Sequence, residues 1–421
     1  MPLAAGRQIF SRLCLKNHNQ ILSRIVRGRF SSTATTQIVS DAENTSKILI
    51  PAPEPGKIHA AVLRKFASPL SIENIEQPKV VQPNEVLIDV HYCALNGSDV
   101  LLAENIYMFE PSLPTVLGYE LVGELIQVGQ EAEKAGYKPG DKIIALNKER
   151  HGGFAEQCVA EIGDIWKVPQ SAKLRDVVCI LENYTTALIG LEKHAGIEEN
   201  DLILINVGLA GAGLAAVDLA TNVFRGTVIA VCATEERAAL VRDKGAFAAF
   251  KFSDKKLIKQ IEAAAADRSI KAIFDGVAGE NFKKLLKCFT DVYNSKTAVK
   301  DILRDNNFAV VVQYLSREGR MIVAGVAANV VNPQTEAQEG SFSLTGLSLR
   351  EYRRKNHKLY RQSGDDVLDF FEEGLIRPII SMVTGLYNIN EAKKFVLEMK
   401  SSGKVLIDLK NKEAKMEIIK A

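Results

Sequence analysis

Short apolar runs separated by turn signals fill the chain from about Lys57 to Glu161. The pattern predicts five strands there: Ile58–Val62, Glu85–Leu95, Glu120–Val128, Asp141–Leu146 and Gly153–Val159. A turn signal of proline, glycine and aspartate at residues 139–141 separates two of them. This part of the chain is therefore expected to be a β-rich domain, built as a small distorted barrel.

From about Tyr184 to Val326 the pattern changes to strands that alternate with amphipathic helices. The predicted strands are Leu202–Val207, Thr227–Val231, Ala248–Phe252, Ala272–Asp275 and Arg320–Val323, and the predicted helices are Glu235–Lys244, Lys255–Ala266 and Asn281–Leu286. Alternation of this kind predicts an α/β fold with a doubly wound parallel sheet. Residues 289–312 are interpreted as an insertion without assigned chemistry. The remainder is mixed, with helices at Asp365–Glu373 and Asn390–Ser401 and a last strand at Val405–Leu409.

A glycine-rich turn, Gly208–Gly213, joins the first strand of the α/β region to its helix. Glycines at such a turn let the backbone approach a pyrophosphate, which then lies at the positive end of the helix dipole. The alternative is a tight turn without a ligand, but the strand–turn–helix–strand order favours a dinucleotide site. Ala210 stands where the pattern has its central glycine.

The tip of the second α/β strand bears on the choice of cofactor. Cys232 lies where an NAD-specific site has an acidic residue on the ribose. Without that acid, a 2′-phosphate is not repelled, and Thr234 and Arg237 are expected to contact it. The sequence therefore predicts NADPH.

Composition excludes several classes of function. The 421 residues carry 53 basic and 51 acidic side chains, so the net charge of +2 offers no electrostatic case for nucleic acid. No apolar run reaches the length of a transmembrane helix. The cysteines after residue 14 are widely separated and form no CxxC pair, which implies neither a disulfide framework nor a structural zinc site.

The first forty residues differ from the rest. They contain five arginines and one lysine with no acidic residue before Asp41, followed by a Ser/Thr cluster at residues 31–36. This composition is typical of a mitochondrial transit peptide, and a disordered basic tail is the alternative. We interpret residues 1–36 as the transit peptide and 37–56 as a linker, and expect the protein in the mitochondrial matrix.

Several short motifs, in this order and spacing, resemble the medium-chain dehydrogenase/reductase superfamily, and within it the zinc-independent quinone oxidoreductases of the zeta-crystallin type. They include Leu95–Asp99, Gly118–Glu120, Lys138–Asp141, Gly152–Glu156, Asn183–Ala187, Gly208–Gly213, Phe274–Gly279, Glu318–Arg320 and Ser402–Asp408. The resemblance implies a GroES-like β-rich catalytic domain plus a doubly wound Rossmann domain. The catalytic domain would occupy residues 57–183 and 331–421, the Rossmann domain residues 184–330, and the active site the cleft between them.

The resemblance also implies a site without metal. Asn96 and Tyr119 stand where zinc alcohol dehydrogenases have a cysteine and a histidine, and no cysteine lies near Glu182, where the last ligand belongs. Tyr107 and Asn96 are then the expected catalytic residues, with Tyr107 donating a hydrogen bond or proton to a carbonyl. The alternative for Tyr107 is simple packing of an apolar loop.

The cofactor contacts implied by the resemblance lie in four places. The turn residues Gly208, Leu209, Ala210, Gly211, Ala212 and Gly213 would surround the phosphates, Ala233 would lie near the tip of the second strand, and Gly325 and Gly346 would follow the nicotinamide. The segment after Gly346 lacks the aromatic run usual in the family.

Three functions are compatible with these features. The first is an NADPH-dependent, zinc-independent reductase of quinones or α,β-unsaturated carbonyls, and the second is a mitochondrial enoyl thioester reductase. The third is a nucleotide-binding protein with little or no catalysis, which Ala210 and the segment after Gly346 favour. The expected partners are a small carbonyl or quinone substrate and further copies of the chain, as a dimer or tetramer by analogy.

Overall fold

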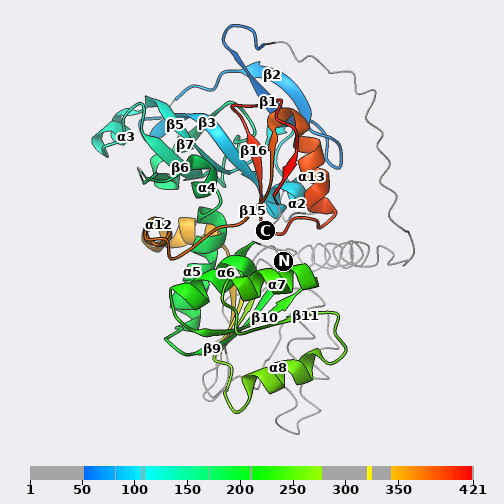
Figure 1. Cartoon of the computed structure of the whole chain (residues 1–421). Helices are drawn as coiled ribbons and strands as arrows, with labels where there is room; N and C mark the ends of the chain where they lie inside the picture. The colour runs from blue at the N-terminus through cyan, green and yellow to red at the C-terminus, as the bar shows by residue number, and fades with distance from the viewer. Residues whose placement is uncertain are drawn as a thin grey trace, which may run out of the picture. The chain divides into compact units, whose positions relative to one another are not determined.

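A computed structural model describes residues 52–80, 82–105, 107, 110–169, 171–208, 211–276, 320–324 and 343–419 (Figure 1). The chain divides into Met1–Pro53 and Glu54–Ala421, and only the second unit is discussed below. The predicted transit peptide, nearly all of the linker, the helix at 281–286 and the insertion at 289–312 lie outside the described residues, as do Leu209, Ala210 and Gly325.

The β-rich part consists of two sheets. A three-stranded sheet has the order β2-β1-β4, and an eight-stranded sheet has the order β17-β15-β16-β3-β5-β6-β8, with β7 paired to β3. The bounds are β1 Lys57–Leu63, β2 Ser71–Glu76, β3 Glu85–Leu95, β4 Thr115–Val116, β5 Glu120–Val128, β6 Lys142–Leu146, β7 Gln157–Glu161, β8 Ile165–Lys167, β15 Ile380–Gly385, β16 Lys404–Asp408 and β17 Glu417–Ile418. The C-terminal strands, red in Figure 1, therefore complete the sheet that the N-terminal strands begin.

The central pair β3 and β5 shows why this sheet curves. Its register shifts twice, between Leu87 and Ile88 and between Val90 and Tyr92. A Cβ at Gly123 would lie 2.0 Å from the Asp89 carbonyl oxygen, so only glycine allows the two backbones to approach here. The inward side chains, such as Leu121, form a core that excludes water.

The α/β part is a six-stranded parallel sheet in the order β11-β10-β9-β12-β13-β14. Its bounds are β9 Leu202–Gly208, β10 Thr227–Cys232, β11 Ala248–Lys251, β12 Ala272–Asp275, β13 Arg320–Ala324 and β14 Ser343–Leu347, with helices α6 Ala212–Asn222, α7 Glu235–Asp243 and α8 Leu257–Ala265. The strand order corresponds to 3-2-1-4-5-6, which is that of a Rossmann dinucleotide-binding fold. The predicted doubly wound sheet is confirmed, and its sixth strand lies beyond the expected boundary at residue 330.

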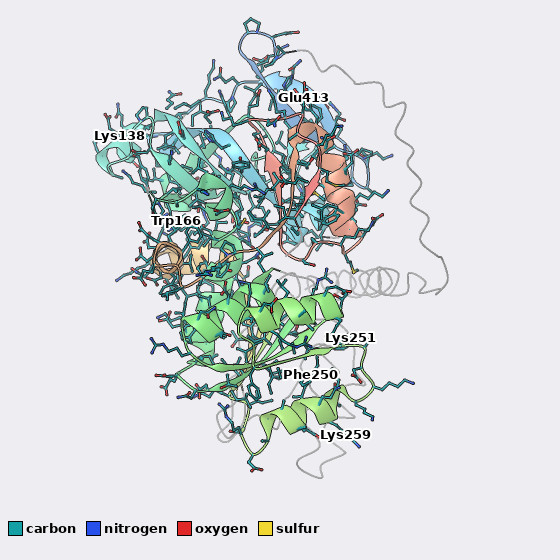
Figure 2. All side chains as sticks on the ribbon, viewed as in Figure 1. Lys138, Trp166, Phe250, Lys251, Lys259 and Glu413 are labelled. Atoms are coloured by element: carbon teal, nitrogen blue, oxygen red, sulfur yellow. The ribbon has the colours of Figure 1, made fainter. Side chains whose placement is uncertain are left out.

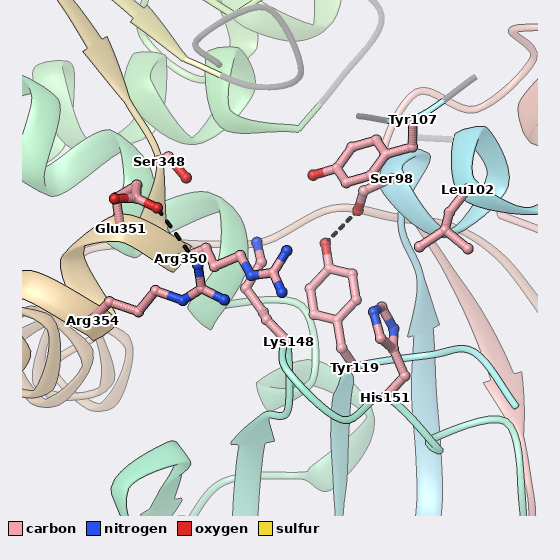
Figure 3. A pocket seen from close by; sticks show the side chains of 10 residues that line it. All are labelled: Ser98, Leu102, Tyr107, Tyr119, Lys148, His151, Ser348, Arg350, Glu351 and Arg354. Atoms are coloured by element: carbon pink, nitrogen blue, oxygen red, sulfur yellow. Dashed lines mark hydrogen bonds and ion pairs between the residues drawn. The ribbon is translucent and has the colours of Figure 1, made fainter. Parts of the chain in front are cut away.

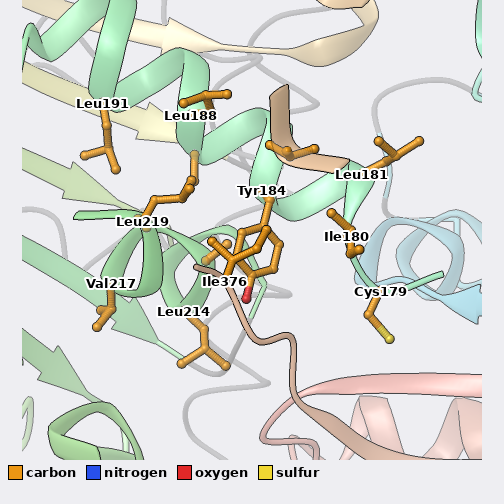
Figure 4. Close-up of a cluster of buried hydrophobic side chains, with 14 of the residues drawn as sticks. Cys179, Ile180, Leu181, Tyr184, Leu188, Leu191, Leu214, Val217, Leu219 and Ile376 are labelled. Carbon is orange, nitrogen blue, oxygen red and sulfur yellow. The ribbon is translucent and has the colours of Figure 1, made fainter. Parts of the chain in front are cut away.

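A helical segment leads from the β-rich part into the Rossmann sheet. It comprises η2 Leu181–Thr185, α5 Thr186–Leu188 and η3 Ile189–Ala195, and its apolar side chains pack on α6 (Figure 4). The buried Asp218 of α6 accepts hydrogen bonds from Tyr184 Oη at 2.6 Å, Lys244 Nζ at 2.9 Å and the Arg377 amide at 2.9 Å. This carboxylate joins the segment to the chain that returns to the β-rich part.

Helix α12, His357–Glu372, packs against β8. The indole of Trp166, labelled in Figure 2, meets Gly364, where a Cβ would lie 2.4 Å from the ring. Tyr360 packs edge-on to the same indole at 5.4 Å.

The remaining helices of the described residues are α2 Gly97–Ala103, α3 Gln130–Lys134, α4 Leu174–Val177, α11 Leu349–Lys355 and α13 Ile389–Leu397, with single turns η1 Ile162–Asp164 and η6 Leu386–Asn388. Across the described ranges, no helix combines the length and apolarity needed to cross a bilayer.

Candidate active site

A cavity of about 210 Å³ lies where the β-rich part meets the segment that follows β14 (Figure 3). The β-rich part contributes Ser98, Leu102, Tyr107, Tyr119, Lys148 and His151, and the segment contributes Ser348, Arg350, Glu351 and Arg354. Ser348 directly follows β14 at the carboxyl end of the Rossmann sheet. Ligands of doubly wound folds bind at this end of the sheet.

Hydrogen-bonding groups converge on Tyr119 in this cavity. Its hydroxyl lies 2.7 Å from Ser98 Oγ, and Lys148 Nζ lies 4.7 Å from the centroid of its ring. Burial raises the pKa of Tyr119 well above its ordinary value, so the phenol is protonated at neutral pH. Tyr107 also lines the cavity and packs against the apolar core, and burial raises the pKa of its phenol too.

Asp99 stabilises the first turn of α2 through hydrogen bonds to the backbone. This buried carboxylate accepts hydrogen bonds from the backbone amides of Asn96 at 3.0 Å and Gly118 at 3.1 Å. Burial raises the pKa of Asp99 to about 7. His151 Nδ1 lies 3.9 Å from the same carboxylate, and burial, with Lys148 second, lowers the pKa of His151 to about 4. The imidazole is therefore neutral at pH 7.

A buried ion pair joins Glu120, the first residue of β5, to Lys404, the first residue of β16. Lys404 Nζ donates to Asn96 Oδ1 at 2.6 Å and to Glu120 Oε2, and Asn96 Nδ2 donates to the same Glu120 oxygen at 2.9 Å. The other oxygen of Glu120 accepts the backbone amide of Glu182 at 2.9 Å. Glu120 is fully buried and Lys404 is 7% exposed.

These contacts place Asn96 between two buried charges. Both ends of its amide are paired with them, and it is absent from the described residues that line the cavity. In this geometry Asn96 supports the charged pair, and its catalytic role stays a prediction. Among the described residues, no three His, Cys, Asp or Glu side chains converge as a metal centre requires.

On the other wall of the cavity, two arginines bind one carboxylate. Arg350 donates to both oxygens of Glu149 at 2.8 and 2.7 Å, and Arg354 donates to the same two oxygens at 3.1 and 2.9 Å. The hydrogen bond from Arg350 is the largest reason that the pKa of Glu149 falls to about 2. Lys148 is paired in turn with Glu182 Oε2 at 2.6 Å. Sequence reasoning missed these cations, because each ion pair joins residues distant in the sequence.

The described glycines of the glycine-rich turn have conformations that suit a dinucleotide-binding turn. Gly208 and Gly211 adopt positive φ angles of 61° and 76°. A Cβ at Gly213 would lie 2.7 Å from Val207 Cα, so this glycine allows helix and strand to pack closely. Among the described residues, a Cβ at Gly211 would meet Asn183 Oδ1, at 3.6 Å. Ala212 begins α6, and Gly346 lies in β14 opposite Val323.

At the tip of β10, Ala233 is exposed and Thr234 caps α7 by accepting the Arg237 amide at 3.4 Å. The Arg237 guanidinium is buried and donates to the carbonyls of Met399 and Ser401 at 2.8 and 2.7 Å. In this geometry the guanidinium is turned to the C-terminal segment, and the contact between Arg237 and a 2′-phosphate stays a prediction. Lys251 is exposed at the end of β11 and lies in register with Cys232. Sequence reasoning missed this cation near the tip of β10.

Comparisons with known proteins agree with this architecture. The model of the alcohol dehydrogenase GroES-like domain matches residues 82–170. Quinone oxidoreductase-like protein 2 of Bos taurus is 28% identical over 83% of this chain and 92% of its own length. The chain is therefore similar to quinone oxidoreductase-like proteins of the medium-chain dehydrogenase/reductase type, and it is an oxidoreductase.

Two further comparisons extend this likeness. Acryloyl-coenzyme A reductase of Sulfurisphaera tokodaii is 26% identical over 80% of this chain and 95% of its own length. The quinone oxidoreductase of Thermus thermophilus, whose structure was also solved with NADPH, superimposes with a TM-score of 0.64 at 19% identity. It covers 83% of this chain and all of that chain, and at this identity it supports the fold alone.

Proposed function

We propose that the protein is an NADPH-dependent, zinc-independent reductase of quinones or α,β-unsaturated carbonyls. The observation that carries the proposal is the cavity at the carboxyl end of the Rossmann sheet, where Ser98, Tyr107, Tyr119 and Lys148 gather. Three of these are hydroxyl groups and one is a cation, so the cavity favours an oxygen that gains negative charge. The relatives named above, quinone oxidoreductase-like protein 2 and an acryloyl-coenzyme A reductase, support a reduction.

The proposed chemistry divides between cofactor and protein. When bound, the reduced nicotinamide supplies a hydride. Tyr107 then donates a hydrogen bond or a proton to the carbonyl oxygen, since its phenol is protonated at neutral pH. The hydrogen bond between the hydroxyl groups of Tyr119 and Ser98 orients Ser98 at the cavity wall. The Lys404–Glu120 pair lies outside the cavity lining and acts indirectly, because Glu120 accepts the backbone amide of Glu182, whose carboxylate binds Lys148.

Two observations at the second strand support NADPH over NADH, and one opposes it. Cys232 places no carboxylate at the ribose, and burial raises the pKa of its thiol to about 12, so it carries no negative charge. Lys251 is in register with Cys232 and offers a cation at the same edge. Glu235 and Glu236, which begin α7 nearby, oppose a phosphate and reduce the expected preference.

The second candidate is an enoyl thioester reductase, which the acryloyl-coenzyme A reductase relative favours. The cavity volume of about 210 Å³ is smaller than the roughly 300–1,000 Å³ of typical ligand pockets. A compact enone or quinone therefore fits better than a long acyl chain.

The decisive experiment is a screen of NADPH oxidation across matched quinones, enones and enoyl thioesters, each with and without a metal chelator. The proposal expects turnover of quinones or enones that the chelator leaves unchanged. Turnover of enoyl thioesters alone would support the second candidate. Tight NADPH binding without turnover of any substrate would support the third function, a binding protein with little catalysis.

Localisation and assembly are part of the same proposal. We propose that residues 1–36 direct import to the mitochondrial matrix, because they are rich in arginine and free of acids. Amino-terminal sequencing of protein taken from cells tests this, and an intact Met1 on organelle-free protein would contradict it. A homo-oligomer is proposed by analogy with the superfamily, and light scattering of the purified protein measures it.

A further inference from the structure

The cavity has an uneven distribution of charge. Among the described residues, three cations line it, Lys148, Arg350 and Arg354, and one acid, Glu351. Glu149 and Glu182, which pair with these cations, are not among the residues that line the cavity. The cavity lining, drawn in Figure 3, therefore carries more cations than acids.

The arginine pair adds an excess of positive charge. Two guanidinium groups share the single carboxylate of Glu149, and the pKa of about 2 keeps that carboxylate at one negative charge throughout the neutral range. The second acid nearby, Glu351, lies 3.9 Å from Arg354 and forms a closer ion pair with Lys355 at 2.9 Å. With Glu351 paired to Lys355, the three cations Lys148, Arg350 and Arg354 have two acidic partners, Glu149 and Glu182, which leaves one unit of positive charge.

The two arginines differ in how firmly they are held. Arg350 is 24% exposed, so it forms a fixed wall of the cavity. Arg354 is 48% exposed, binds Glu149 at longer distances and can turn its guanidinium toward a ligand. A planar guanidinium matches a planar carboxylate with two parallel hydrogen bonds.

We propose that this cavity selects substrates that carry a carboxylate, and that Arg354, with Arg350 and Lys148 beside it, forms the carboxylate subsite. The inference rests on the proposed function, because it names the class of carbonyl compound that would be reduced. The opposite wall carries Tyr107 and Ser98, which would receive the carbonyl oxygen. A short oxo-acid, with its carbonyl and carboxylate a few bonds apart, spans the two walls.

Binding of unreactive probes tests the subsite separately from turnover. The probes are 4-oxopentanoate and its neutral isostere 4-oxopentanamide, titrated by ligand-observed NMR against the full chain with NADP⁺. A charge-assisted contact predicts that the carboxylate binds about tenfold to a hundredfold more tightly than the amide. The same ratio is measured for Arg354→Gln, for Arg354→Lys, and for the control Lys355→Gln.

Lys355→Gln is a matched control because it removes one positive charge from the same helix at a side chain that is 77% exposed and outside the cavity lining. The proposal expects Arg354→Gln to reduce the carboxylate preference at least fivefold, Arg354→Lys to retain part of it, and Lys355→Gln to leave it unchanged. Equal binding of the two probes overturns the proposal. An equal loss of the carboxylate preference in Arg354→Gln and Lys355→Gln also overturns it, because that result would reflect only the long-range electrostatic field of the positive charges. Failure of the proposed function is a separate result, namely that neither 4-oxo-2-pentenoate nor its amide supports NADPH oxidation.

Discussion

Replacing Lys404 by methionine leaves the carboxylate of Glu120 in the core without its cation. The side chains of Lys404 and Glu120 are 6% and 0% exposed, so water cannot replace the lost partner. Removing one member of a buried ion pair typically costs about 3–5 kcal/mol. Glu120 keeps the hydrogen bonds from Asn96 Nδ2 and the Glu182 amide, both at 2.9 Å, so we expect the lower end, about 3 kcal/mol.

Urea unfolding followed by the fluorescence of Trp166 measures this loss. Trp166 is the single tryptophan of the chain and lies buried on β8, in the sheet that also contains β5 and β16. With a urea dependence of about 3 kcal/mol per molar, the midpoint should fall by about 1 M. The control Lys410→Met removes the exposed ion pair with Asp89, which is worth about 0–1 kcal/mol.

The double variant Lys404→Met with Glu120→Gln completes the test. Because it removes both charges, it should be more stable than Lys404→Met alone, by about 2 kcal/mol. A midpoint for Lys404→Met within about 0.2 M of the wild-type value would refute the reasoning, as would a double variant less stable than the single one. Either result would mean that the buried carboxylate does not depend on this cation.

Three further predictions concern the cavity and the cofactor. The pKa of His151 is about 4 in the folded chain, below its ordinary 6.5. The folding stability present above pH 6.5 should therefore fall by about 3 kcal/mol as the pH falls toward 4. The variant His151→Asn should lack this loss when its free energy of unfolding is measured at the two pH values. Tyr107→Phe should lower kcat about 100-fold with NADPH affinity unchanged, and an unchanged kcat would assign the proton to water. Lys251→Met should weaken NADPH binding about tenfold in a fluorescence titration while NADH binding stays constant, and an equal effect on both cofactors would exclude a contact with the 2′-phosphate.

Local pattern was sufficient for much of the fold. The predicted bounds of β3, β5 and β12 match the structure, because each strand is an apolar run that turn residues limit. The strand expected at Gly153–Val159 instead begins at Gln157, because Phe154 is buried and its backbone bonds to Ala61 and Leu117. Helix α12 begins at His357 rather than Asp365, since its polar first turns are fixed by the Asn356 cap and by distant partners.

The site was less accessible from the sequence than the fold. The glycine-rich turn and Tyr107 carry local signals, but Lys404 and Glu120 are 284 positions apart, and no pattern along the chain pairs them. Arg350 and Lys148 lie in polar segments that resemble solvated surface, and only the fold brings them to one cavity. Asn96 was predicted to be catalytic from its place in a motif, and no local pattern indicates that both ends of its amide are paired with buried charges.

Transfer of deuterium from NADPH labelled at C4 of the nicotinamide tests the central claim, that this chain reduces a carbonyl compound by hydride transfer. The protein is mixed with an α,β-unsaturated ketone and an excess of cofactor deuterated on either face, and the product is analysed by mass spectrometry. The account predicts a saturated ketone with one deuterium at the β-carbon for one face of the label, formed in step with NADPH oxidation. NADPH that binds without oxidation, or a product without deuterium from both labels, would contradict it.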